Sequence, residues 1–241
     1  IMLPELTFPY LIPGQEVLLD DGKIHLKIVE KAENMAENGG ENTQGKRYFA
    51  KVLWGGLLKS RKSAALPGAK IYPPTLTNSD LANIKIAKEM GVTGVMQPFV
   101  RDHSDLECVK EALREAGAED IRLFAKIENM DGVRKLEKLL PAADEIVIAR
   151  GDLGNAVHLW DLPGVQRQIS EKCRAAGKPF MVVTQMLASM ERSPVPTRAE
   201  VNDIFHAVMD GAASIMVTGE TAVGDYPVEV IRYMVNTVRS A

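Results

Sequence analysis

Two short runs of this sequence carry side chains that could perform chemistry together. Lys126-Ile-Glu128 ends one apolar run. Asp152 comes shortly after the next apolar run, and it lies between two glycines, Gly151 and Gly154. Alternate residues of a strand point to the same side, so Lys126 and Glu128 would share one face of a strand end. Glu128 and Asp152 could supply hard oxygen ligands to Mg2+, which takes the rest of its shell from water or substrate oxygens.

The lysine of this set suggests what such an ion would be used for. A lysine beside a divalent ion can stabilise the charge of a phosphoryl group in transfer, and Lys126 fits that role. Gly151 and Gly154 would let backbone N–H groups approach a carboxylate or phosphate. Taken alone, a Lys-x-Glu run is usually a solvated ion pair and a Gly-Asp-x-Gly run is usually a turn. Their occurrence on successive strand ends favours a site.

Other candidate motifs are weaker. The run Gly40-x4-Gly45-Lys46-Arg47 imitates a phosphate-binding P-loop, but Arg47 stands where Ser or Thr is required and the run lies in a predicted hairpin. The four histidines show no metal-ligand spacing. The two cysteines are far apart on predicted helices, which is typical of reduced side chains that pack in a core.

Strands and helices alternate along the part of the chain that would position these residues. Each of five apolar runs is followed by a segment of helical periodicity, which predicts parallel strands with right-handed crossovers. The predicted strands end near Gln97, Ile127, Ala149, Val183 and Val217. Their spacing suits a (β/α)8 barrel and a doubly wound open sheet equally. In both folds ligands bind beyond the carboxyl ends of the strands.

The helix boundaries are predicted from capping residues. We expect a continuous helix that carries Val133, Leu136 and Leu140, and another that begins at Pro227. The predicted capping boxes are Thr77 with Asp80, Ser104 with Glu107, and Thr197 with Glu200.

The first seventy residues have a different pattern. Alternating apolar residues at 16–20 and 23–29 flank Asp21-Gly22, which predicts a β-hairpin, and 48–54 predicts a further strand. Two proline clusters follow before helical periodicity begins. We therefore predict two domains, a β-rich domain over 1–71 and an α/β domain over 72–241.

Composition excludes several classes of protein. The chain has 241 residues, of which 46% are hydrophobic and 25% charged, as in ordinary globular proteins. A net charge of −3 offers no basic field for nucleic acid or anionic lipid. No apolar run approaches a membrane span, and no signal peptide is recognisable. We expect a cytoplasmic protein that binds neither nucleic acid nor membrane.

Several longer runs occur in a fixed order along the chain: Lys126-Ile-Glu-Asn129, Ala149-Arg-Gly-Asp-Leu-Gly154, Thr184-Gln-Met-Leu187, Pro196-Thr-Arg-Ala-Glu200 and Gly219-Glu-Thr-Ala222. In residue identity, order and spacing these runs resemble those of the pyruvate kinase family. Ser60-Arg-Lys62 and Leu19-Asp-Asp-Gly22 resemble the small lid domain of that family. The resemblance covers essentially the whole chain.

This resemblance implies a TIM (β/α)8-type barrel that is incomplete here, with strands four to eight preceded by a β-rich lid. It implies phosphoryl transfer between phosphoenolpyruvate and ADP, giving pyruvate and ATP in glycolysis. The implied cofactors are Mg2+ (or Mn2+) and K+, although the usual K+ ligands of the family lie in strands that this chain lacks.

The resemblance also assigns roles to individual residues. Lys126 and Thr184 would be catalytic, and Glu128 and Asp152 would bind the metal. Gly151, Asp152 and Thr184 would hold the carboxylate of phosphoenolpyruvate, and Lys62 would contact the nucleotide phosphates.

Two other functions remain open on sequence grounds. One is a metal-dependent lyase that acts on a pyruvate-like enolate. The other is a non-catalytic relative that binds Mg2+ and a small carboxylate. Because five parallel strands leave two open edges, we expect a homo-oligomer or a completing chain.

Overall fold

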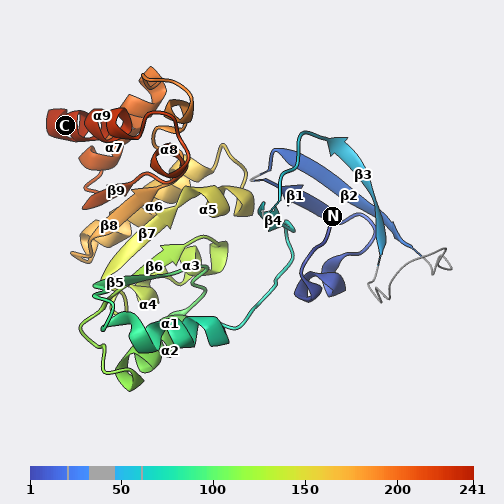
Figure 1. Ribbon diagram of the computed structural model, residues 1–241, viewed down its shortest axis with the longest axis horizontal. Helices are drawn as coiled ribbons and strands as arrows, with labels where there is room; N and C mark the ends of the chain where they lie inside the picture. Colours follow the sequence, from blue (N-terminus) through green and yellow to red (C-terminus); the bar gives the residue numbers. More distant parts are fainter. Residues whose placement is uncertain (21, 33–46, 61) are drawn as a thin grey trace. The chain divides into compact units, whose positions relative to one another are not determined.

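The computed structural model describes residues 1–20, 22–32, 47–60 and 62–241 (Figure 1). The chain divides into two compact units, Ile1–Pro73 and Pro74–Ala241. Among the described residues, the helices are all too short or too polar to cross a bilayer.

The first unit is a four-stranded antiparallel sheet with the strand order β3-β2-β1-β4. Its hairpin is confirmed, because Leu19 pairs with Ile24 across the β1–β2 turn. Asp20 and Gly22 have positive φ angles of 49° and 82°, whereas Asp21 lies outside the described residues. So do the predicted second turn at 37–45 and most of the P-loop-like run. The elements are η1 (Glu5–Tyr10), β1 (Glu16–Leu19), β2 (Ile24–Lys31), β3 (Tyr48–Trp54) and β4 (Ala64–Ala65).

The second unit alternates strands and helices, as the sequence predicts. Its strands are β5 (Gly94–Gln97), β6 (Arg122–Ile127), β7 (Glu145–Ala149), β8 (Phe180–Val183) and β9 (Ser214–Met216). Its helices are α1 (Asn78–Ala87), α2 (His103–Glu115), α3 (Met130–Arg134), α4 (Leu136–Leu139), α5 (Arg150–Ala156), α6 (Leu162–Ala175), η2 (Ala188–Glu191), α7 (Arg198–Met209), α8 (Gly219–Ala222) and α9 (Pro227–Ser240).

The five strands of this unit form one parallel sheet in chain order, β5-β6-β7-β8-β9. The pairs Ile127–Ile148 and Ala149–Val183 bring the carboxyl ends of β6, β7 and β8 to the same edge. The fold is therefore α/β, and among the described residues the sheet is open at β5 and β9. All predicted site residues except Lys62 lie at the carboxyl ends of these strands or directly after them.

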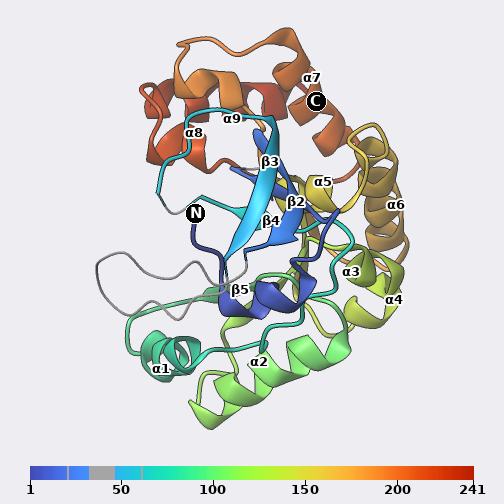
Figure 2. The ribbon, with the colours of Figure 1, turned by 90° about the vertical axis from the view of Figure 1, so that its right-hand side faces the viewer.

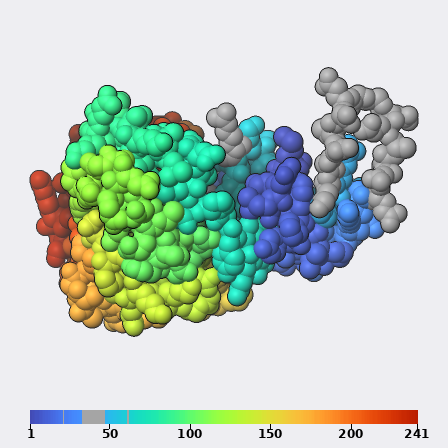
Figure 3. All heavy atoms as spheres, turned by 90° about the horizontal axis from the view of Figure 1, so that it is seen from below, coloured from blue at the N-terminus to red at the C-terminus, as the bar shows by residue number. Residues whose placement is uncertain are grey.

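The two faces of the parallel sheet differ. Leu123, Ile127, Ile146, Ile148 and Val182 point to the face that the helices cover and are fully buried. Figure 2 shows α1 to α4 and α6 on this outer side of the strands, and in the space-filling view the same helices form much of the visible surface of the unit (Figure 3).

The opposite face carries a smaller apolar cluster. Val147, Ala149 and Val183 are buried there, whereas Phe124, Met181 and Met216 are only half-buried. At the amino end of this face the Ser214 hydroxyl on β9 donates to Glu145 on β7 at 2.5 Å, reaching across β8. Side chains of alternate strands therefore meet on this face.

Two predicted boundaries are wrong in detail. The helix expected to carry Val133, Leu136 and Leu140 is broken at Lys135 into α3 and α4, although the three apolar side chains are buried. The helix expected to be capped by Ser104 is capped by Asp102, which accepts a hydrogen bond from the Ser104 N–H at 3.0 Å. The capping boxes at Thr77 and Thr197 are confirmed.

Candidate functional site

Lys126 and Glu128 form an ion pair at the carboxyl end of β6. The Lys126 Nζ lies 2.7 Å from Glu128 Oε1. The Glu128 side chain is only 1% exposed, whereas that of Lys126 is 25% exposed. The sequence prediction that these two side chains lie on the same side of the strand end agrees with this geometry.

The second oxygen of Glu128 has a partner that the sequence did not indicate. Oε2 accepts a hydrogen bond from the backbone N–H of Phe99 at 2.7 Å. Phe99 follows β5 and has a positive φ of 51°, an uncommon conformation for a bulky residue. Burying a carboxyl group without partners is costly, so the ammonium and the amide together offset the cost of burying the Glu128 side chain.

The donor set around Glu128 fits a hard divalent cation. Each carboxylate oxygen has two lone pairs, so Glu128 can coordinate a metal ion in addition to making its present hydrogen bonds. Asp152 lies in the first turn of α5, directly after the neighbouring strand β7. In the described part of the chain no three His, Cys, Asp or Glu side chains form a metal-binding group. A cation held by these two carboxylates would therefore complete its shell with water or substrate oxygens.

Gly151 packs directly against Thr184, which follows β8. A Cβ on Gly151 would lie 3.0 Å from the Thr184 Cγ2 and 3.6 Å from its hydroxyl oxygen, so glycine permits this close approach. Gly154 is different, because a Cβ there would meet only Leu162 at an ordinary 3.5 Å. A tight packing contact with another side chain is thus present at Gly151 and not at Gly154. The close approach of an anion to the N–H groups at both glycines stays a prediction.

Thr184 and Gln185 form a strained turn at the end of β8. Their φ angles are 82° and 55°, in the region that L-residues rarely occupy. The carbonyl of Thr184 accepts hydrogen bonds from Arg150 Nε at 3.2 Å and from Arg150 Nη2 at 2.7 Å. Arg150 Nη1 donates to both oxygens of Asp203, at 2.8 and 2.7 Å. The start of α5, the turn after β8 and α7 are therefore joined through one guanidinium.

Sequence reasoning named neither Phe99 nor the Arg150–Asp203 pair as functional. Arg150 was noted only as part of the glycine-containing loop. Asp203 lies 53 residues away on α7, and nothing in its spacing indicates a partner. The available signal was the position of Arg150 itself, a large cation directly after a fully buried strand.

Lys62 belongs to the first unit, unlike the other predicted site residues. Its Nζ lies 2.8 Å from Asp20 Oδ1, and its side chain is 37% exposed. The hydrogen bond from Lys62 lowers the pKa of Asp20 below its ordinary value, against the opposing effect of burial.

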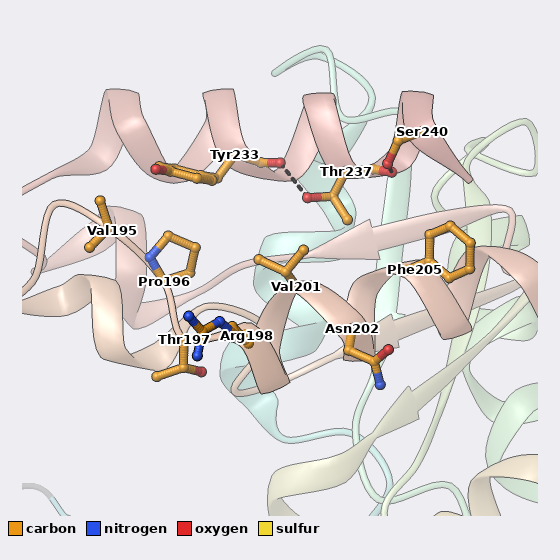
Figure 4. A pocket seen from close by; sticks show the side chains of 10 residues that line it. All are labelled: Val195, Pro196, Thr197, Arg198, Val201, Asn202, Phe205, Tyr233, Thr237 and Ser240. Atoms are coloured by element: carbon orange, nitrogen blue, oxygen red, sulfur yellow. Dashed lines mark hydrogen bonds between the residues drawn. The ribbon is translucent and has the colours of Figure 1, made fainter.

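A cavity of about 530 Å3 lies elsewhere in the second unit, between α7 and α9 (Figure 4). Val201 and Phe205 of α7 face Tyr233 and Thr237 of α9 across it. None of the predicted site residues lines it. The polar groups that can do chemistry are at the carboxyl edge of the sheet, so we place the candidate site there.

Comparisons with known proteins agree on one family. The model of the pyruvate kinase barrel domain matches residues 6–231. The chain is 39% identical over 223 residues to the pyruvate kinase of Bacillus licheniformis, covering 92% of this chain and 36% of that protein. It is 39% identical over 232 residues to the enzyme of Geobacillus stearothermophilus, covering 95% of this chain and 38% of that protein. It is 35% identical to the enzyme of Clostridium acetobutylicum, covering 95% of this chain and 46% of that protein.

The matched segment is thus nearly the whole chain but less than half of each of these relatives. Identity of this extent, together with the match to the barrel-domain model, establishes kinship beyond the individual motifs. The chain belongs to the pyruvate kinase family.

Proposed function

We propose that this chain carries the site for phosphoryl transfer between phosphoenolpyruvate and ADP. Two contacts on neighbouring strand ends of one sheet support this most directly. They are the Lys126–Glu128 ion pair, in which Glu128 is buried, and the packing of Gly151 against Thr184. The reaction moves the phosphoryl group from the enol oxygen to a terminal oxygen of ADP. The enolate then takes a proton on its methylene carbon and becomes pyruvate.

Each residue has a role in this proposal. Lys126 stabilises the negative charge of the phosphoryl group during transfer. Glu128 and Asp152 would hold Mg2+ or Mn2+, which when bound neutralises phosphate and carboxylate charge. The N–H groups of Gly151 and Asp152, with the Thr184 hydroxyl, hold the substrate carboxylate, and Thr184 lies near the carbon that is protonated. Lys62 contacts the nucleotide phosphates.

We further propose that the second unit is an arc of a (β/α)8 barrel, strands four to eight, and that the first unit is the lid. The Glu145–Ser214 hydrogen bond across β8 supports a curled sheet, because layers of side chains from alternate strands fill the interior of such barrels. K+ is expected through the family. The open edges of the arc support assembly with a second copy or a completing chain.

The chain spans 36–46% of the length of the three relatives described above. One alternative to the phosphoryl-transfer function is a protein that binds Mg2+ and a small carboxylate without turnover. Two measurements on the same samples distinguish the two functions. Pyruvate formation from phosphoenolpyruvate is followed by a coupled assay with ADP and Mg2+, with and without K+. Binding of Mg2+ with oxalate, a stable mimic of the pyruvate enolate, is measured by calorimetry on the same samples.

Three variants make the assay specific to the site. Lys126→Met and Asp152→Asn should each lower turnover by about a hundred- to a thousand-fold. Lys172→Met, which breaks a Lys–Glu pair with Glu137 away from the sheet edge, is the matched control and should be nearly as active as the wild type.

The outcomes separate the candidate functions. Pyruvate formation that is indifferent to both site substitutions would remove the kinase proposal. Oxalate binding without turnover, abolished by Asp152→Asn, would favour the non-catalytic alternative. Release of pyruvate from a carbon–carbon cleavage substrate without nucleotide would indicate the lyase.

A further inference from the structure

We infer that Arg150, oriented by Asp203, is a positioning residue that sets where the Thr184 hydroxyl lies. The inference rests on the proposed function, in which Thr184 contacts the substrate. Arg150 itself acts through Thr184 and does not need to touch the reacting atoms.

The first step concerns the backbone of the turn after β8. Thr184 and Gln185 are consecutive non-glycine residues with positive φ, and Thr184 is β-branched, which makes this conformation more unfavourable. Backbone of this kind persists only where surrounding contacts hold it in place. The direction of the Thr184 side chain depends on this conformation.

The second step identifies the contacts that hold the turn. The Arg150 side chain is 13% exposed and donates two hydrogen bonds to the Thr184 carbonyl. Its Nη2 also lies 2.9 Å from the Met186 sulfur, two residues further along the turn. A planar guanidinium spreads five N–H donors over three nitrogens in a fixed fork, whereas the three donors of a lysine ammonium share one nitrogen and cannot reach the same widely spaced acceptors.

The third step concerns the anchor of the guanidinium. Nη1 donates to both oxygens of Asp203, whose side chain is 34% exposed on α7. The helix that carries Asp203 is fixed at its start by a capping box between Thr197 and Glu200. Asp203 therefore holds Arg150 from a rigid element, and charge-assisted hydrogen bonds of this kind are among the stronger ones in proteins.

The fourth step links Arg150 to the other side of Thr184. Gly151, the next residue along the chain, contacts the Thr184 side chain, since a Cβ there would lie 3.0 Å from Cγ2. The Arg150 side chain thus holds the carbonyl of Thr184 while the backbone beside Arg150 confines its side chain. Movement of the Arg150 side chain or of the Gly151 backbone would displace the Thr184 hydroxyl relative to the first turn of α5, which contains Asp152.

The test compares Arg150→Lys and Asp203→Asn with Arg122→Lys in the full chain. Arg122 also pairs with a carboxylate, Glu145 at 3.2 Å, but at the opposite end of the sheet, so it is a matched control. In the coupled assay, Arg150→Lys should lower kcat by about 10- to 100-fold, while the KM for ADP changes little. Asp203→Asn, the milder substitution, should also lower kcat with little change in the KM for ADP. Arg122→Lys should leave both constants nearly unchanged.

A second readout depends on the position of Thr184 rather than on overall folding. Exchange of the pyruvate methyl protons with solvent, measured with ATP and Mg2+, should fall more in Arg150→Lys than phosphoryl transfer does. Equal losses in Arg150→Lys and Arg122→Lys, or an unchanged kcat in Arg150→Lys, would overturn the inference.

The inference can fail separately from the proposed function. If the wild-type chain neither forms pyruvate nor binds Mg2+ with oxalate, the proposed function is wrong. The position of Thr184 is then followed by NMR of threonine methyl groups, with Thr184→Ser assigning the signal. A Thr184 methyl signal that shifts in Arg150→Lys and in Asp203→Asn but not in Arg122→Lys supports the inference, and a signal that stays in place overturns it.

Discussion

At the scale of single residues, Glu128 depends on two partners that compensate for its burial. It is almost fully buried, and its two oxygens are satisfied by Lys126 and by the Phe99 N–H. Removing one partner of a buried ion pair leaves an uncompensated charge, which destabilises a protein more than loss of the pair's own attraction. Variants at Lys126 should therefore be tested for folding as well as for turnover.

Asp105 provides a prediction for the dependence of stability on pH. Burial would raise its pKa, but hydrogen bonds from Arg101 and Thr75 outweigh burial and lower the pKa to about 2. The ordinary value is 3.8, so the carboxylate stabilises the fold above about pH 4. This contribution, about 2 kcal/mol, is lost as the pH falls from 4 towards 2.

Asp105→Asn should therefore lower the free energy of unfolding by about 2 kcal/mol at pH 7, and the difference from the wild type should shrink at pH 3. Urea titrations at pH 7, 5 and 3 measure this. Asp120→Asn, at an exposed carboxylate paired with Lys88, is the control and should change little. A difference that is the same at all three pH values would contradict the proposed role of the charge.

At the scale of elements, the start of α2 shows how sequence and structure can differ. Ser104-x-x-Glu107 has the form of a capping box, but the side chain of Asp102 occupies the N-cap position. Both signals were present in the sequence two residues apart. The choice between them depends on where the chain leaves the loop after β5, which tertiary packing decides.

The two candidate caps can be separated by substitution. Asp102→Ala should destabilise the chain by about 1 kcal/mol, because the Ser104 N–H loses its acceptor and the helix dipole loses a nearby negative charge. Ser104→Ala should cost less than half as much. Thermal and urea unfolding of both variants test this, and the reverse order would show that Ser104 is the cap.

The elements of the second unit were predictable where the pattern is local. The buried runs at 145–149 and 180–183 coincide with β7 and β8. The break between α3 and α4 was not predictable, because Val133, Leu136 and Leu140 keep a helical spacing and remain buried on both sides of it. A pattern of apolar residues indicates which side of a helical segment is buried. It does not indicate whether the backbone hydrogen bonds of the helix are continuous.

In the candidate site, too, the contacts between residues close in sequence were predictable and the long-range contacts were not. Lys126 and Glu128 are two residues apart, so strand geometry alone brings them together. Arg150 and Asp203 are 53 residues apart, and the Phe99 N–H reaches Glu128 over 29 residues. These contacts arise from the order of strands in the sheet and from the packing of α7, neither of which a local pattern specifies.

At the scale of the molecule, the second unit has two strand edges without partners among the described residues, and several apolar side chains on one face of its sheet are partly exposed. β5 and β9 each pair with one neighbour there. Met96 on β5 is 38% exposed, and Phe124, Met181 and Met216 on the same sheet are only half-buried. Proteins usually cover such edges and faces, because unpaired backbone groups and apolar surface favour association.

The chain is therefore expected to self-associate. Size-exclusion chromatography with light scattering, at two concentrations, should give a mass above the 26.4 kDa of the single chain. Met96→Lys places a charge beside the open edge and should shift the mass towards that of the monomer. Met90→Lys, at an exposed methionine beyond the end of α1, should leave it unchanged. A wild-type chain that remains monomeric at both concentrations and binds no apolar dye would show that the sheet face is covered within the chain itself.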